Sequence, residues 1–185
     1  PEKTFYLSVH YTAPHSPWGP EEHPEEYRKM YDDCELKATP DLPIHRNQIR
    51  TCPIGDTPEK RRENLVGYYA AISAMDAGVG KIIDKLRSKD LLDNTIIIFT
   101  ADNGMNMGHH GIWGKGNGTY PPNMYDSAVK VPLIICVPNN KAKGVVCSNM
   151  TSQYDIFPTI LEFAKCEWEP QPMQPGRSIA WMTEN

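Results

Sequence analysis

The longest regular pattern in the chain is a run of apolar residues spaced three and four apart. This spacing places apolar side chains on one face of an α-helix. Thr57 is a suitable N-cap, Pro58 suits the first helical turn, and basic residues gather near the end, at about Lys89. The pattern predicts one long amphipathic helix. Its apolar positions are Leu65, Tyr68, Tyr69, Ile72, Met75, Val79, Ile82, Ile83 and Leu86.

Three short runs of branched and aromatic residues predict strands, at Thr4–Val9, Thr95–Thr100 and Val131–Val137. The second run is uniformly apolar, which is typical of a strand covered on both faces in a parallel sheet. A further helix is predicted over residues 156–165, with Asp155 as its cap. The order of elements predicts an α/β fold with a mostly parallel central sheet flanked by helices.

Two stretches lack a clear period. Residues 19–57 are polar and rich in proline, with a short helix predicted near Glu25–Tyr31, so we expect a long surface excursion that frames a site or a partner surface. Residues 167–185 are expected to form a tail. The chain enters its first strand at once, so we expect residues 1–185 to form a single partial domain of a longer protein.

Composition narrows the function classes. The 185 residues carry a net charge of −4, with 39% hydrophobic and 23% charged residues, which favours a globular domain and gives no indication of nucleic-acid binding. No apolar run is long enough to span a membrane. The five cysteines show no CxxC spacing, which argues against a zinc knuckle or a disulfide framework.

Candidate chemistry follows the second strand. Asp102 and Asn103 offer a carboxylate and an amide oxygen, the donors that calcium or magnesium prefers, although "DNG" is equally a strong turn sequence. Lys115 follows in a glycine-rich loop without a neighbouring acid, as in sites that hold a sulfate or phosphate ester. The spacing does not fit a phosphate-binding P-loop.

Three histidines lie in the loops after predicted strands. His15 sits in the turn "APHSPW" after the first strand and is suited either to proton donation or to a structural hydrogen bond. His109 and His110 are adjacent, so their side chains diverge, and loop packing is favoured for the pair. Of the two, we expect His110 to contact a ligand. Because ligands bind at the carboxyl ends of strands in α/β sheets, these loops predict one site.

Taken in order, these segments resemble the sulfatase family of the alkaline-phosphatase superfamily. The resemblance rests on six stretches that cover nearly the whole chain. They are "FYLSVHYTAPHSPW", "AAISAMDAGVGKIIDKL", "TIIIFTADNGMNMGHHGIWGKG", "YDSAVKVPLIICVP", "TSQYDIFPTILEFA" and "PGRSI".

The resemblance implies roles for four residues. Asp102 and Asn103 would supply two ligands to a divalent cation, most often Ca²⁺ with Mg²⁺ as the alternative. Lys115 would contact the sulfate and the bridging oxygen. His15 would bind the sulfate and help to protonate the leaving alcohol. The expectation that His110 contacts substrate rests on its place in the loop alone. In dizinc relatives of the superfamily the segment resembles "DHG", so "DNG" favours a single hard metal.

The family's nucleophile is a formylglycine made from a C/S-x-P-x-R motif, which this chain lacks. Cys52 in "TCPIGD" is rejected, because its proline comes one position early and no arginine follows at the required place. The resemblance therefore places the nucleophile upstream of this chain. It implies a hydrolase of sulfated small-molecule or carbohydrate esters, with an exported location suggested by the family alone.

Two alternatives stay open at this point. One is a phosphoester or phosphonate hydrolase on the same scaffold, and the other is a non-catalytic binding domain derived from it. A partial domain lacking half the site would be inactive alone. It would also expose sheet edges, so self-association or pairing with the missing N-terminal segment is expected.

Overall fold

The computed structural model describes residues 4–140 and 144–183, which form two compact units. The first unit comprises residues 1–85 and 103–131, and the second comprises residues 86–102 and 132–185. Residues 184–185 of the predicted tail lie outside the described residues. The units are considered separately, and the prediction of a single partial domain stays a prediction.

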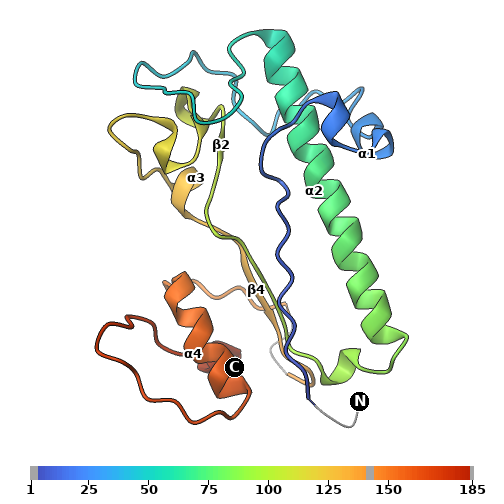
Figure 1. Cartoon of the computed structure of the whole chain (residues 1–185), viewed down its shortest axis with the longest axis vertical. Coiled ribbons are helices and arrows are strands. Elements are labelled where there is room, and N and C mark those ends of the chain that lie inside the picture. The colour runs from blue at the N-terminus through green and yellow to red at the C-terminus, as the bar shows by residue number, and fades with distance from the viewer. Residues whose placement is uncertain (1–3, 141–143, 184–185) are drawn as a thin grey trace. The chain divides into compact units, whose positions relative to one another are not determined.

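The first unit is built on α2, Pro58–Arg87, which is the predicted long helix (Figure 1). The Thr57 hydroxyl accepts a hydrogen bond from the Lys60 backbone N–H at 3.3 Å, which confirms the predicted cap. Burial is concentrated in residues 64–71, while the apolar positions farther along the helix are only half-buried.

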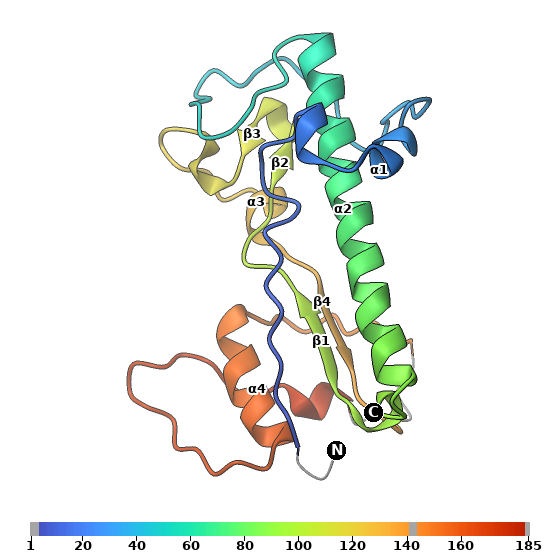
Figure 2. The ribbon, with the colours of Figure 1, turned by 45° about the vertical axis from the view of Figure 1, so that its right-hand side comes forward.

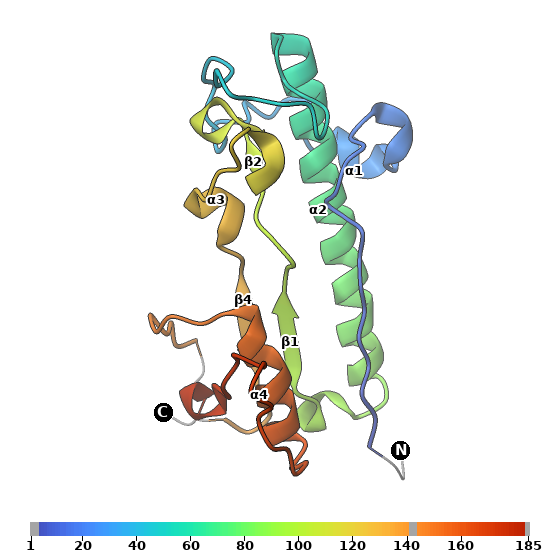
Figure 3. The same ribbon diagram turned by 60° about the vertical axis from the view of Figure 1, so that its left-hand side comes forward.

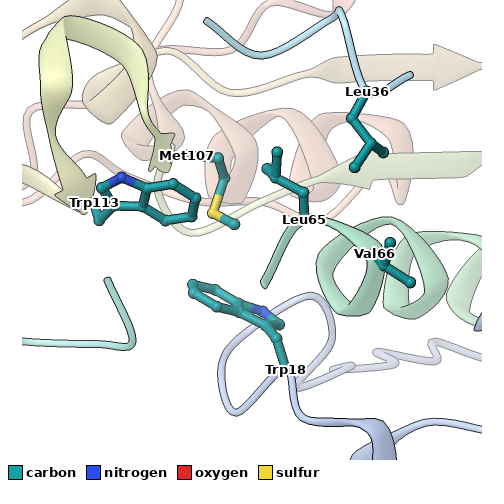
Figure 4. Packing of buried hydrophobic residues seen from close by; sticks show 6 residues of the cluster. All are labelled: Trp18, Leu36, Leu65, Val66, Met107 and Trp113. Atoms are coloured by element: carbon teal, nitrogen blue, oxygen red, sulfur yellow. The ribbon is translucent and has the colours of Figure 1, made fainter. Parts of the chain in front are cut away.

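The hydrophobic core of this unit lies against the first turns of α2. Six buried side chains from four parts of the chain meet there (Figure 4): Trp18, Leu36, Leu65, Val66, Met107 and Trp113. The backbone at Trp18 crosses α2 at Gly67, where a Cβ atom would lie 2.1 Å from the Trp18 carbonyl oxygen. This close approach is available only to glycine.

The excursion of residues 19–57 contains η1, Pro20–Glu22, and α1, Glu25–Lys29, which confirms the short predicted helix. The excursion is tied to α2 by arginine side chains. Arg62 donates to the carbonyls of Cys34 and Tyr31, both at 3.1 Å, and Arg61 donates to that of Thr39 at 2.8 Å. Although it is largely exposed, the excursion is therefore anchored at several points.

The remainder of the first unit is the glycine-rich segment. It contains β2, Asn106–Met107, paired antiparallel with β3, Trp113–Gly114. Short helical turns η3, His109–Gly111, and η4, Gly116–Gly118, precede α3, Asp126–Val129. These elements lie together beside the N-terminal half of α2 (Figure 2).

The second unit contains η2, Leu92–Asn94, and a sheet of two strands, β1, Ile97–Thr100, and β4, Leu133–Cys136. The strands pair antiparallel, with Thr100 opposite Leu133. The prediction of a mostly parallel sheet is therefore wrong for the described residues. A parallel pair needs a connection that crosses back to the starting edge, whereas residues 101–132 leave and return at the same end of the sheet.

Two further strand predictions need correction. The side chains of β1 are half-buried along its length and not covered on both faces. Residues 4–9 are extended but exposed, and no described strand pairs with them. They run along α2 (Figure 3), where the Tyr11 hydroxyl approaches Gly78. A strand is defined by hydrogen bonds to a neighbour, which residues 4–9 lack within the described chain.

The predicted C-terminal helix is confirmed as α4, Ile156–Phe163, preceded by η5, Gln153–Asp155. The Asp155 carboxylate does not cap α4. It accepts from the Ser152 backbone N–H at 2.8 Å and from that of Arg177 at 3.0 Å. Ile179 is buried and is followed by η6, Ala180–Thr183, so this part of the predicted tail is packed.

The contact at Gly67 predicts opposite effects for two glycine substitutions in α2. Gly67→Ala should lower the free energy of unfolding by about 1–3 kcal/mol, because the added methyl group overlaps backbone atoms that cannot rotate away. Gly80→Ala should raise it by about 0.4–1 kcal/mol, since no atom lies within 4 Å of the new Cβ. Urea denaturation followed by circular dichroism measures both, and equal effects would contradict the prediction.

Candidate active site

His15 is positioned by a turn that is fixed at both ends. The His15 backbone N–H donates to the Thr12 carbonyl at 3.0 Å, and the Trp18 indole N–H donates to the Pro14 carbonyl at 3.0 Å. Trp18 is 1% exposed, so the turn is anchored in the core. The His15 side chain itself is exposed.

The protonation of His15 follows from its hydrogen bond. Its Nδ1 lies 2.8 Å from the Ser16 carbonyl oxygen, and a carbonyl can only accept, so Nδ1 carries a proton. Nε2 is therefore the ring nitrogen left to contact a ligand. A ring held in this way suits proton donation at Nε2.

Lys115 lies directly after β3 and is held by its backbone. The Asn123 side-chain amide donates to the carbonyls of Lys115 at 3.3 Å and Gly116 at 3.1 Å. Two positions earlier, the Gln48 side-chain amide exchanges two 2.8 Å hydrogen bonds with the backbone of Trp113. The Lys115 ammonium forms no ion pair with any described residue, so it is available to an anion.

Asn103 belongs to the first unit and Asp102 to the second. The Asn103 amide nitrogen donates to the Gly104 carbonyl at 2.9 Å, which leaves Oδ1 as the atom for a ligand. The Asp102 carboxylate is exposed and has no protein partner within the described ranges. Gln153 instead donates to the Asp102 backbone carbonyl at 2.6 Å and so fixes the chain at the end of β1.

These two oxygen donors fit a hard divalent cation as part of its ligand set. Within residues 4–140 and 144–183, no group of three or more histidine, cysteine, aspartate or glutamate side chains is arranged to hold a metal. Calcium takes six to eight oxygen ligands, so Asp102 and Asn103 could supply at most two of them.

The two adjacent histidines diverge, as the sequence predicts. The His109 Nδ1 accepts from the Met107 backbone N–H at 3.3 Å, and burial, with a smaller effect of His110, lowers the pKa of His109. His110 is exposed in a left-handed conformation, φ 57°, and stacks on Tyr125 with ring centroids 3.9 Å apart. No pattern in the sequence predicts the stacking of His110 on Tyr125.

Gly111, with φ 72°, allows the excursion to cross the glycine-rich segment. A Cβ at this position would lie 2.1 Å from the Pro43 carbonyl oxygen. The Gly111 carbonyl accepts from the His45 backbone N–H at 2.8 Å, and the Gly118 carbonyl accepts from that of Ile49 at 3.0 Å. Residues 45–49 thus line the loop that carries Lys115, a role that sequence reasoning did not assign to them individually.

Cys52 packs against the core, and burial raises the pKa of its thiol to about 11. A thiol that stays protonated is a poor nucleophile. This environment agrees with the rejection of Cys52 as a reactive group. None of the helices in the described part of the chain has the combination of length and hydrophobicity required to cross a bilayer.

Comparisons with known proteins relate the chain to one family. Choline-sulfatase from Rhizobium meliloti (strain 1021) is 30% identical over 95% of this chain and 35% of its own length. Human iduronate 2-sulfatase is 29% identical over 97% of this chain and 34% of its own length. The chain thus spans about a third of the length of these curated relatives.

Solved structures give the same picture of a partial fold. The yidJ protein of Bacteroides fragilis superimposes with a TM-score of 0.72 and 27% identity, covering 94% of this chain and 35% of that one. BT4656, solved with D-glucosamine-2-N,6-O-disulfate, has a TM-score of 0.60 and 31% identity over 69% of this chain and 24% of its own.

A phosphonate monoester hydrolase from Silicibacter pomeroyi also matches, with a TM-score of 0.62 and 30% identity over 71% of this chain and 24% of its own. The family model described as Sulfatase matches residues 1–166, which is most of the chain. The chain belongs to the sulfatase family, within the alkaline-phosphatase superfamily.

Proposed function

We propose that this chain is part of a hydrolase that cleaves sulfate esters and contributes one wall of its active site. The observation that carries the proposal is Lys115, an ammonium without an ion-pair partner in the described chain, on a loop fixed by Asn123 and Gln48. His15 is held in the same unit by Trp18. Membership of the sulfatase family supports the choice of sulfate esters.

In the proposed reaction, Lys115 binds the sulfate and the bridging oxygen. Its fixed positive charge stabilises the negative charge that grows there as the ester bond breaks. His15, protonated at Nε2, gives that proton to the leaving alcohol oxygen, while Nδ1 keeps its hydrogen bond to Ser16. His110 contacts the substrate beside Tyr125.

Asp102 and Asn103 are proposed as two ligands of a divalent cation, Ca²⁺ before Mg²⁺. The family's cation and formylglycine would supply positive charge at the sulfate and the attacking oxygen. We place the formylglycine outside residues 1–185, so this chain alone is proposed to be inactive. The proposed substrates are sulfated small molecules or carbohydrates, in line with the sulfated sugar bound to BT4656.

A phosphonate or phosphate ester is the second candidate substrate. The 30% identity to a phosphonate monoester hydrolase favours keeping it, since sulfate and phosphonate esters present similar tetrahedral oxyanions to Lys115. Comparing kcat/KM for 4-nitrophenyl sulfate and 4-nitrophenyl phenylphosphonate distinguishes the two. A preference for the phosphonate ester would overturn the sulfatase assignment.

Replacing the lysine tests its role in charge stabilisation. In the natural full-length protein, Lys115→Ala should lower kcat/KM for 4-nitrophenyl sulfate by about 100-fold to 1000-fold, the usual cost of losing one group that stabilises a developing oxyanion. Lys130→Ala is the matched control, because Lys130 is exposed and its one ion pair among the described residues is with Asp126. A change below threefold in Lys115→Ala, about 0.6 kcal/mol, would refute the role.

The proton donated by His15 should matter most for poor leaving groups. His15→Ala should lower kcat for an alkyl sulfate at least about tenfold more than for 4-nitrophenyl sulfate, because nitrophenolate leaves without a proton. His10→Ala, a nearby exposed histidine that contacts Ser8, provides the control. Equal losses for both esters would show that His15 does not act as the acid.

The metal ligands are tested by stability and not only by turnover. Excess Ca²⁺ should raise the melting temperature of the natural full-length protein, by an amount equivalent to about 2.7 kcal/mol at 100 times the dissociation constant. Asp102→Ala should abolish most of this shift, whereas Asp93→Ala should retain it. Calorimetry with Ca²⁺ and with EDTA measures both, and an unchanged shift in Asp102→Ala would exclude Asp102 as a ligand.

A further inference from the structure

A cleft of about 410 Å³ lies in the first unit, beside the loop that carries Lys115. One wall comes from residues 45–47 of the excursion and the other from residues 112–125 of the glycine-rich segment. Neither wall has a part in the chemical steps proposed above. We call this the Arg46 cleft, after the one fully charged side chain in its lining.

Both walls of the Arg46 cleft are fixed by backbone hydrogen bonds. The His45 N–H donates to the Gly111 carbonyl at 2.8 Å, and the Tyr120 N–H donates to the Asn47 carbonyl at 3.1 Å. Asn123, which lines the cleft, also donates to the Lys115 carbonyl. The cleft is therefore preformed and shares a wall residue with the Lys115 loop.

The lining of the cleft favours an anion. Arg46 is exposed and forms no ion pair with a described residue, and no aspartate or glutamate lines the cleft. His45 accepts from the Asn47 backbone N–H through Nδ1 at 3.1 Å, so its neutral ring carries the proton on Nε2 and can donate there. Arginine binds sulfate or carboxylate oxygens through two parallel hydrogen bonds.

The opposite side of the cleft is apolar and aromatic. Tyr125 is 40% exposed and its ring is braced by the stack with His110, at an interplanar angle of 14°. Met124 is 78% exposed beside it. A ligand with an apolar face and one or more charged substituents, such as a sugar ring, matches this combination of surfaces.

A second cleft, of about 340 Å³, serves as a comparison. Its cation, Arg61, already has protein partners. The Arg61 guanidinium donates to the Thr39 carbonyl at 2.8 Å and lies 3.3 Å from the Asp41 carboxylate. Asp56 also lines it and would repel an anion. Only the Arg46 cleft, of these two, presents a cation without a protein partner.

We propose that the Arg46 cleft binds the alcohol part of the ester and that Arg46 pairs with a second anionic group on it. The ligand class is a sugar that carries another sulfate or a carboxylate besides the ester to be cleaved. This inference rests on the proposed function in one respect: the sulfate ester lies at Lys115, so that the alcohol part extends into the Arg46 cleft. The binding of the second anion itself does not depend on hydrolysis.

The test uses sugars that lack a sulfate ester and measures their binding, not their hydrolysis. Binding of N-sulfoglucosamine, glucuronic acid and neutral N-acetylglucosamine to the natural full-length protein is measured by titration calorimetry. Arg46→Gln should weaken binding of the preferred anionic sugar about tenfold and leave the neutral sugar unchanged. Arg46→Lys should give an intermediate loss, because charge remains without the planar fork.

Arg50→Gln is the matched control, since Arg50 lies on the same segment, outside the cleft, and approaches Asp56 at 3.7 Å. It should not change the affinity. Whichever anionic sugar responds to Arg46→Gln identifies a sulfate or a carboxylate as the second group. Absence of binding at millimolar concentration, or equal losses for the anionic and neutral sugars, would overturn the inference.

Lys115→Ala separates this inference from the proposed function. It should abolish hydrolysis of sulfate esters but leave the affinity for N-sulfoglucosamine unchanged. If Lys115→Ala and not Arg46→Gln weakens the binding of N-sulfoglucosamine, the sugar occupies the sulfate site and the Arg46 cleft is refuted. If hydrolysis survives Lys115→Ala while Arg46→Gln still weakens binding, the cleft stands and the proposed catalytic role fails.

Discussion

The burial of Trp18 against α2 is the contact on which the first unit depends. Its backbone lies directly on Gly67, its ring joins the core with Met107 and Trp113, and its indole N–H closes the turn that holds His15. Trp113 lies two positions before Lys115 in the sequence. One set of apolar contacts therefore fixes both the histidine turn and the lysine loop, so core packing and the geometry of the candidate site are physically linked in this unit.

The local pattern of the sequence predicted the helices well and the sheet poorly. The long helix, the short helix near residue 25 and the helix after Asp155 follow from side-chain spacing and caps, which act over a few residues. Strand direction is a property of pairs. Nothing within Thr95–Thr100 or Val131–Val137 encodes whether the partner strand is parallel. The pattern therefore does not predict the antiparallel pairing of β1 with β4.

The residues of the candidate site also fall into two groups, those that the sequence identifies and those that it does not. Asp102, Asn103, Lys115 and His15 were identified from residue type and from the ordered family resemblance, and their roles stay predictions. The supporting residues were not identified, because Gln48 and Asn123 act through amide contacts with backbone atoms up to 65 positions away in the sequence. Such contacts leave no periodicity or motif. The Tyr125 stack and the Arg46 cleft depend on the same long-range packing.

The hydrogen bonds that anchor the excursion have an evolutionary consequence. Arg61 and Arg62 fasten residues 31–39 to α2, and the 45–49 segment is fastened to the glycine-rich loop, so the ends of each intervening stretch are held independently. Substitution of Arg46, whose side chain takes part in none of these hydrogen bonds, can change the lining of the Arg46 cleft without altering the contacts that hold the His15 turn and the Lys115 loop. The scaffold thus allows the lining of this cleft to diverge among descendants while the contacts that anchor the candidate site are inherited intact.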